Sequence, residues 1–521
     1  MSFAKIFSAQ STLLKAQIID VEIDLSSGLH QFSIVGLPDK GVEESRDRVS
    51  SAIKNSGFTS PKQENKKIIV ALAPADVKKE GPAFDVAIAL AYLMASEEII
   101  FNPKERLFLG ELSLDGELRP IQGVLPLTRT AKEKGFKEIY VPKQNATEAA
   151  LIDGISVFAV SSLSELVSHL DETVKKKLGR RPKVTLVPEP KTIYKPERPE
   201  IMLDLSDIKG QENAKRALEI AAAGGHNIAM YGPPGTGKTM LAKAFAGLLP
   251  ELSFEDMLEV TSIYSVAGQL KNQPIIVEPP VRTPHHTASY VSLVGGGTNP
   301  KPGEVTLAHK GVLFLDEFPE FDKKVIEALR QPLEDRVVTI SRAKASVQFP
   351  AHFILIAAMN PCPCGNWGSK DKRCICAPAH ILRYQQKLSG PIMDRIDLWV
   401  EVPSVDHNKL SDTSSSGEKS SDIKTRVNAA RILQQNRFKK AGRSIRTNAE
   451  MNTKDLSRDI ILSEKLKEFF NLSAKRLDLS ARAYHRVLKL ARTIADLEGT
   501  EELKEHHLAE ALQYRPKQKT I

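Results

Sequence analysis

The stretch that decides the fold is Ile228-Ala-Met-Tyr-Gly-Pro-Pro-Gly-Thr-Gly-Lys-Thr239. Its first four residues predict a buried strand, its last eight match the P-loop pattern, and residues 240–249 predict a helix directly afterwards. A glycine-rich turn between a strand and a helix N-terminus presents backbone N–H groups to phosphates. We therefore expect a nucleotide to be bound by Gly232, Pro233, Pro234, Gly235, Thr236, Gly237, Lys238, Thr239 and Met240.

A second motif, Gly311-Val-Leu-Phe-Leu-Asp316-Glu317, is an apolar strand that ends in two carboxylates. Phosphoryl transfer depends on positioned metal, lysine and water more than on covalent chemistry. We expect Lys238 to contact the outer phosphates, and Thr239 and Asp316 to hold Mg²⁺. Glu317 is then expected to polarise the attacking water, so the two motifs together predict an ATPase.

Three further polar residues are candidates for the same catalytic machinery. Asn360 ends the apolar segment 353–359, where its amide can orient the lytic water. Arg395, in Ser389-Gly-Pro-Ile-Met-Asp-Arg-Ile-Asp397, can neutralise charge at the γ-phosphate, and such an arginine often comes from a neighbouring subunit. Arg482 begins a C-terminal helix. By spacing alone, an ordinary surface or salt-bridge role is favoured for each arginine over a catalytic one.

The chain has 521 residues, which exceeds what one hydrophobic core supports, so several domains are expected. In the first part, strands are expected at 17–25, 32–35, 67–72 and 138–141, and helices at 42–55 and 85–95. Alternating strands and helices from 205 predict a parallel sheet. The predicted organisation is an α/β domain at 1–170, a basic proline-rich linker at 171–204, an α/β ATPase domain at 205–403, a mobile loop at 404–422 and a helical domain at 423–521.

Composition narrows the class of protein. Apolar residues make up 41% and charged residues 26% of the chain, which is ordinary for a globular protein. No apolar run has the ~20 residues that a membrane helix needs, and no signal-peptide pattern is present, so we predict a cytoplasmic protein without a membrane partner. The net charge of +9 permits a polyanionic partner such as DNA but fits a solvated basic surface equally well.

All four cysteines, Cys362, Cys364, Cys374 and Cys376, fall in an insertion at 361–377. This clustering favours metal over a disulfide framework, and four thiolates suit tetrahedral Zn²⁺. The C-x-C spacing is tighter than the usual C-x₂-C, so free thiols or a redox pair remain as alternatives. We predict a structural zinc, because four thiolates leave no open position for catalysis.

A β-hairpin is predicted at 337–349, with Arg342 and Lys344 near its tip. These side chains can contact DNA phosphates, although a solvated turn is an equal alternative. By resemblance to related ring motors, the segment 262–271 is a second candidate for DNA contact. His285 and His286 have no third ligand nearby in sequence, which favours a structural or subunit-contact role over a metal pair.

The chain resembles the ComM/YifB-type magnesium-chelatase-like AAA+ proteins over essentially its full length. The resemblance makes Asn360 sensor 1, Arg395 the arginine finger and Arg482 sensor 2. It implies an AAA+ core with a helical C-terminal lid, a homo-oligomeric, hexameric ring, and ATP-driven branch migration of DNA during natural transformation, with a recombinase as a candidate partner. The segments that carry it are Pro284-His-His-Thr-Ala-Ser289, Leu293-Val-Gly-Gly-Gly297, Pro302-Gly-Glu304, Leu307-Ala-His309, Gly311–Glu317, Met359-Asn-Pro-Cys-Pro-Cys-Gly365, Ser389–Asp397 and Ala511-Leu-Gln-Tyr-Arg-Pro516.

The N-terminal α/β domain resembles the proteolytic domain of Lon, a ribosomal S5 domain 2-like fold. The similarity runs through Lys79-Glu-Gly-Pro82 and residues 110–123. Where that protease has its serine nucleophile and lysine base, this chain has Ala83 and Leu125. Neither side chain can attack a carbonyl or carry a proton. We therefore expect a proteolytically inactive domain that serves assembly or substrate docking.

Three functions are compatible with this core, because fold alone does not determine function. The favoured one is a DNA helicase or branch-migration translocase. The alternatives are a chelatase-type motor that drives metal insertion into a tetrapyrrole, and a protein-remodelling ATPase. The Lon-like domain and the cysteine insertion favour the DNA motor, and the loss of the peptidase residues argues against the third reading.

Overall fold

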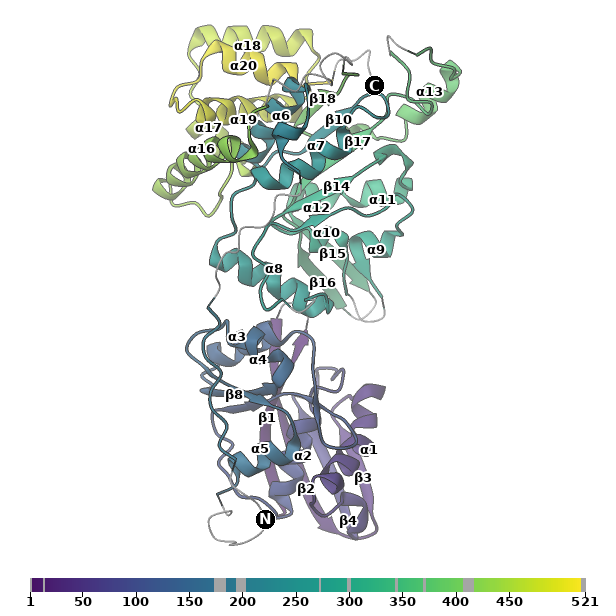
Figure 1. The fold of residues 1–521 in the computed structure, drawn as a ribbon, viewed down its shortest axis with the longest axis vertical. Helices are drawn as coiled ribbons and strands as arrows, with labels where there is room; N and C mark the ends of the chain where they lie inside the picture. Colours follow the sequence, from purple (N-terminus) through teal and green to yellow (C-terminus); the bar gives the residue numbers. More distant parts are fainter. Residues whose placement is uncertain are drawn as a thin grey trace. The chain divides into compact units, whose positions relative to one another are not determined.

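The computed structural model describes residues 2–12, 15–172, 184–193, 203–270, 273–297, 301–342, 345–368, 372–405 and 417–516. The chain forms two compact units. The first unit consists of Met1–Pro196 and Met257–Ile276, and the second of Glu197–Asp256 and Val277–Ile521. The elements of both are labelled in Figure 1. Parts of the predicted linker and of the predicted loop at 404–422 lie outside the described residues.

The first unit contains three sheets and the helices packed on them. The expected strands and helices of this part of the chain are confirmed, with a shift of a few residues at their ends. One sheet has the order β1-β2-β4-β3, a second is parallel with the order β5-β8-β9, and a small antiparallel sheet pairs β6 with β7. The elements are β1 (Phe3–Thr12), β2 (Lys15–Ser27), β3 (Gln31–Val35), α1 (Lys40–Asn55), β4 (Lys66–Ala73), α2 (Asp85–Ala95), β5 (Arg106–Phe108), β6 (Glu111–Leu112), β7 (Leu118–Arg119), α3 (Val124–Glu133), α4 (Lys143–Ala149), β8 (Glu138–Pro142), β9 (Ser156–Val160) and α5 (Leu163–Leu170).

Helix α2 is the centre of this unit and is buried along almost its whole length. Its first residue, Asp85, is fully buried and accepts hydrogen bonds from Arg48 Nε at 2.8 Å and Leu112 N at 3.2 Å. Ser45 donates a further hydrogen bond to the same carboxylate. These partners satisfy a buried charge that would otherwise be costly, and they join α1 to α2.

Helix α8 (Phe254–Ala267) starts in the second unit, but Met257–Ile276 packs with the first unit. Val260 and Ile263 on this helix are fully buried, and Ser265 donates to the buried carboxylate of Glu148. The sequence placed this segment inside the ATPase domain at 205–403. The hydrogen bond from Ser265 to Glu148 is one contact through which this segment associates with the N-terminal unit.

The core of the second unit is a five-stranded sheet in the order β11-β14-β17-β10-β18, in which all pairs are parallel. Every residue of β14 and β17 is buried, as expected for strands covered on both faces. The predicted parallel sheet is therefore confirmed. The strands are β10 (Ile228–Tyr231), β11 (Val281–Arg282), β14 (Val312–Leu315), β17 (Ile354–Met359) and β18 (Leu398–Glu401).

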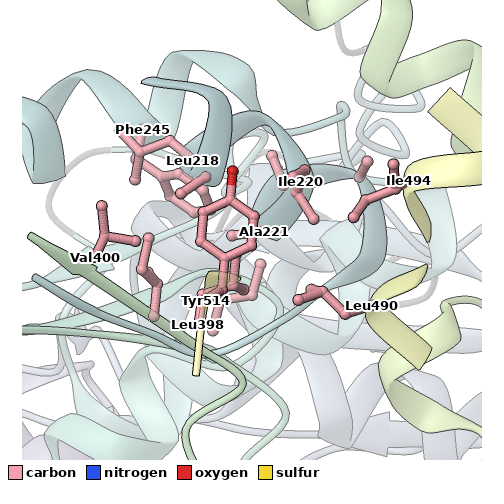
Figure 2. Close-up of a cluster of buried hydrophobic side chains, with 14 of the residues drawn as sticks. Leu218, Ile220, Ala221, Phe245, Leu398, Val400, Leu490, Ile494 and Tyr514 are labelled. Atoms are coloured by element: carbon pink, nitrogen blue, oxygen red, sulfur yellow. The ribbon is translucent and has the colours of Figure 1, made fainter. Parts of the chain in front are cut away.

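The C-terminal helices share a hydrophobic core with this sheet. Figure 2 shows Leu218 and Ile220 of α6 together with Leu398 and Val400 of β18, and with side chains from the C-terminal helices. The labelled residues of the latter group are Leu490 and Ile494 of α19 and Tyr514. The helices are α6 (Glu212–Gly224), α7 (Lys238–Phe245), α16 (Ser420–Lys440), α17 (Thr453–Asp459), α18 (Glu464–Arg476), α19 (Ala481–Leu497) and α20 (Glu505–Gln513).

The remaining elements of the second unit are short. The predicted hairpin is confirmed as the antiparallel pair β15 (Val337–Arg342) and β16 (Ala345–Pro350). Lys344 and the side chain of Arg342 lie outside the described residues, so their contact with DNA stays a prediction. No helix in the described ranges is long and apolar enough to cross a membrane. The other helices are α9 (Tyr290–Val294), α10 (Glu304–Leu307), α11 (Lys323–Ala328), α12 (Arg330–Asp335), α13 (Pro378–Gln385) and α14 (Gly390–Met393), and a small hairpin pairs β12 (Gly295–Gly296) with β13 (Lys301–Pro302).

Candidate nucleotide site

The sequence motifs meet at one edge of the parallel sheet. The P-loop follows β10, Asp316 follows β14 and Asn360 follows β17. These three strands are adjacent and parallel, so their carboxyl ends lie at the same edge. Strand β10 has later strands on both sides, and ligands of open α/β sheets bind where the strand order reverses in this way.

Two glycines of the P-loop are required for different structural reasons. A Cβ added at Gly232 would lie 2.1 Å from the backbone oxygen of Val402, so the loop leaves β10 too close to β18 for any side chain. Gly237 has a φ of +91°, which favours glycine. It caps α7, and this helix begins at Lys238, so the helix N-terminus faces the loop as the sequence predicted.

Lys238 is held inside the loop by backbone and side-chain acceptors. Its Nζ donates to the carbonyl oxygens of Gly232 at 2.8 Å and Pro233 at 2.7 Å, and to Asn360 Oδ1 at 3.3 Å. Burial lowers the pKa of the Lys238 ammonium to about 8, against the opposing effect of the Asp316 carboxylate. The lysine and Asn360 are thus joined by a direct hydrogen bond.

Thr239 and Asp316 also meet directly. Thr239 Oγ1 donates to Asp316 Oδ2 at 2.7 Å, and Asp316 Oδ1 accepts from the backbone N–H of Glu317 at 2.9 Å. A hydroxyl and a carboxylate oxygen at one point form the hard oxygen donor set that Mg²⁺ prefers. These residues therefore fit the predicted metal.

The two candidate arginines lie together, but their ion pairs do not involve the P-loop. Arg395 Nη2 pairs with Glu334 on α12, and Arg482 Nη2 lies 3.4 Å from the other oxygen of the same carboxylate. Arg395 is 7% exposed and also donates to Pro391 O at 2.7 Å. Glu334 was not predicted as a functional residue, and no pattern in the sequence marks it.

His286 is a second residue whose contact the sequence did not reveal. Its Nδ1 lies 3.2 Å from Oε2 of Glu317, and its ring is 4.1 Å from that of His285. Among the described residues, the two histidines belong to no cluster of metal-ligating side chains. The expectation that they are not a metal pair stays a prediction, but His286 clearly faces the candidate site.

The four cysteines are gathered into one cluster, with all four sulfurs within 4.8 Å of one another. Cys362 Sγ lies 3.4 Å from Cys364 Sγ and 3.7 Å from Cys374 Sγ, far beyond the ~2.05 Å of a disulfide. A tetrahedral Zn²⁺ with ~2.3 Å bonds places its sulfurs roughly 3.8 Å apart. Backbone N–H donors, those of Asn366 and Ile375, lower the pKa of the Cys364 thiol to about 6, whereas at Cys374 and Cys376 the backbone donors are outweighed by burial and the neighbouring sulfurs, which raise the pKa of these thiols.

A second group of ligand-type side chains, Glu498, His506 and His507, does not suit a metal. The Nδ1 atom of His507 accepts from the backbone N–H of Lys504 at 3.0 Å, so Nε2 carries the proton. That Nε2 donates to Glu498 at 3.0 Å. The group is therefore a hydrogen-bonded cap of α20.

The positions of the expected Lon dyad hold no catalytic group. Leu125 is buried, and its backbone N–H donates to Glu148 Oε1 at 3.0 Å. Lys79, near Ala83, is fully buried and its ammonium donates to the carbonyl oxygen of Pro74. A buried lysine with a backbone acceptor has a structural explanation.

Comparison with known proteins places this site in context. Models of three families match: "Magnesium chelatase, subunit ChlI" over residues 204–410, "Subunit ChlI of Mg-chelatase" over 21–145, and "Magnesium chelatase, subunit ChlI C-terminal" over 417–515. Competence protein ComM of Haemophilus influenzae is 44% identical over 516 residues, covering 99% of this chain and 98% of the relative. YifB of Escherichia coli is 42% identical over 516 residues, covering 99% and 97%. Lon protease 2 of Bacillus subtilis is 28% identical over 194 residues, covering 35% and 34%.

Proposed function

Because this chain belongs to the ComM/YifB family of magnesium-chelatase-like AAA+ proteins, we propose that it is an ATP-driven DNA motor. Its task would be branch migration of recombination intermediates during natural transformation. The observation that carries the motor is the meeting of the P-loop, Asp316 and Asn360 at one sheet edge. The competence relative supports the DNA substrate.

In this proposal each residue has one role in ATP hydrolysis. The P-loop N–H groups and Lys238 bind the phosphates, and Thr239 and Asp316 hold Mg²⁺, which neutralises charge on the phosphates when bound. The Glu317 carboxylate accepts a proton from the attacking water. Asn360 orients that water from its position beside Lys238.

We propose that Arg395 and Arg482 act together on the nucleotide of a neighbouring subunit. Both reach the same carboxylate of Glu334, so one approaching γ-phosphate can attract both side chains. An arginine supplied by a neighbour requires an oligomer in which each site meets the next subunit. A closed, hexameric ring satisfies that requirement.

The cysteine insertion is proposed to hold a structural Zn²⁺. The sulfur separations match a tetrahedral site, and backbone amide donors stabilise the thiolate of Cys364. A metal that staples a polar loop of this kind contributes directly to its folding.

The N-terminal unit is proposed to be a Lon-like domain without peptidase activity, which docks substrate or supports assembly. Lon protease 2 supports this by partial similarity, and Ala83 and Leu125 remove the dyad. The basic hairpin of β15 and β16 is the proposed DNA contact, and a recombinase is the proposed protein partner.

The test measures ATP hydrolysis with and without a synthetic four-way DNA junction at low salt, and junction dissociation in the same tube. Both activities should rise with the junction and vanish in Glu317→Gln. Glu320→Gln is the matched control, because this carboxylate lies three residues further on and pairs instead with Lys387 at 2.8 Å. It should retain both activities.

The outcomes separate the candidate functions. If the rate of ATP hydrolysis is the same with and without the junction, DNA is refuted as the substrate. That result favours a chelatase-type motor or a protein-remodelling motor. Stimulation by a tetrapyrrole chelatase subunit or by unfolded protein then identifies which one. Normal hydrolysis in Glu317→Gln would remove this residue from its proposed role.

A further inference from the structure

The contact between His286 and Glu317 follows from the pairing of two strands. Strands β11 and β14 run parallel, with Arg282 opposite Leu313. Four residues after each member of this pair, the two segments have left the sheet at the same edge. These positions are His286 after β11 and Glu317 after β14. The imidazole Nδ1 and the carboxylate Oε2 lie 3.2 Å apart there.

The fold fixes the position of His286 from both sides. Arg282, at the end of β11, binds Glu304 through two hydrogen bonds of 2.6 and 2.7 Å. On the other side, Ser289 caps α9 by accepting from Ser292 N at 3.2 Å. The segment between these anchors is short, so the histidine is held beside Glu317 by the backbone on either side.

Glu317 has a fixed backbone but a side chain with freedom to move. Its φ of 51° is left-handed, and its carbonyl oxygen accepts from Glu320 N at 2.7 Å. The Glu317 side chain is 54% exposed, and in the part of the chain that the structure describes its ion-pair partner is His286. A half-exposed glutamate samples several rotamers unless a partner selects one.

We propose that His286 is a positioning residue for ATP hydrolysis, which donates its Nδ1–H to Glu317 Oε2 and leaves Oε1 to meet the attacking water. The proposal rests on the role of Glu317 given above. Among the described residues, the hydrogen bonds of Lys238 and Asp316 do not involve His286, so we expect His286 to act through the orientation of the Glu317 carboxylate. Loss of orientation costs turnover without weakening nucleotide binding.

The test compares His286→Ala, His286→Asn and His286→Phe in the full-length protein. For the alanine and phenylalanine variants we expect kcat for ATP to fall on the order of tenfold, with KM and the Kd of a fluorescent ATP analogue unchanged. Asparagine should restore most of kcat, because its Nδ2 occupies nearly the place of the histidine Nδ1. His380→Ala, at an exposed histidine of α13, is the control and should have no effect.

Several results would overturn this inference. An unchanged or increased kcat in His286→Ala refutes a positioning role, as does a variant whose loss is entirely in KM. If kcat falls equally in the asparagine and phenylalanine variants, His286 contributes packing and does not position Glu317. The same comparison tests the positioning role if the alanine variant does not fold. If Glu317→Gln is inactive while His286→Ala is normal, this inference alone fails. If Glu317→Gln is active, the proposed function fails.

Discussion

Replacement of Asp397 by alanine should destabilise the second unit, because this carboxylate joins the sheet to the C-terminal helices. Asp397 is 3% exposed and pairs with Arg486 of α19. It also accepts from the backbone N–H of Asn227, at the start of β10, at 3.0 Å. His226 Nδ1 lies 3.6 Å from the same carboxylate.

The expected loss of stability in Asp397→Ala follows from the burial of the ion pair between Asp397 and Arg486. Removing one partner of a buried ion pair costs about 3–5 kcal/mol, because the other charge is left uncompensated. Arg486 is 21% exposed, so water compensates part of its charge and the lower end, about 3 kcal/mol, applies. The second unit has about 300 residues, and at an unfolding entropy of about 2.1 cal/mol/K per residue that loss corresponds to a fall in Tm of roughly 5 °C.

The assay is thermal unfolding of the full chain at pH 7, with Glu401→Ala as control, since Glu401 is the exposed last residue of β18, the strand that directly follows Asp397. Burial would raise the pKa of Asp397, but Arg486 and His226 outweigh it and hold that pKa well below its usual range. The stabilisation is therefore full above the unfolded-state pKa, about 3.9, and is lost as the pH falls towards the folded-state pKa. A fall in Tm at pH 7 no larger than that of Glu401→Ala would refute the reasoning.

Three further predictions concern the candidate sites. ATP affinity should weaken as the pH rises above about 8, because Lys238 loses its charge there in the free protein, and isothermal titration at pH 7 and 9 measures this. Cys374→Ser should lower the zinc content measured by atomic absorption and reduce Tm, whereas equal metal in both proteins contradicts a zinc site. Arg395→Ala and Glu317→Gln should each be inactive, but a mixture should regain ATP hydrolysis, because an intact arginine of one subunit then meets an intact base of another. A mixture without activity would argue against an arginine supplied by the neighbour.

The local motifs were readable from the sequence because each is contiguous and its chemistry depends on near neighbours. The strand, glycine turn and helix around Lys238 are one example, and the apolar strand ending at Asp316 is another. The cysteines were readable as a group for the same reason, since only a short insertion separates them. The alternation of strands and helices likewise indicated the parallel sheet, because buried strands require continuous apolar runs.

Other features depend on residues far apart in the chain. The pairing of β11 with β14 sets His286 beside Glu317, and no local pattern predicts that register. Glu334 gathers Arg395 and Arg482 from separate segments, and Ser265 reaches the buried carboxylate of Glu148 from a helix that the sequence assigned to another domain. Sequence alone determined which side chains are candidates for the chemistry, whereas packing and strand register decided which of them meet. The physical reason is that a side chain's partner is selected by the whole core, while its chemical type is fixed residue by residue.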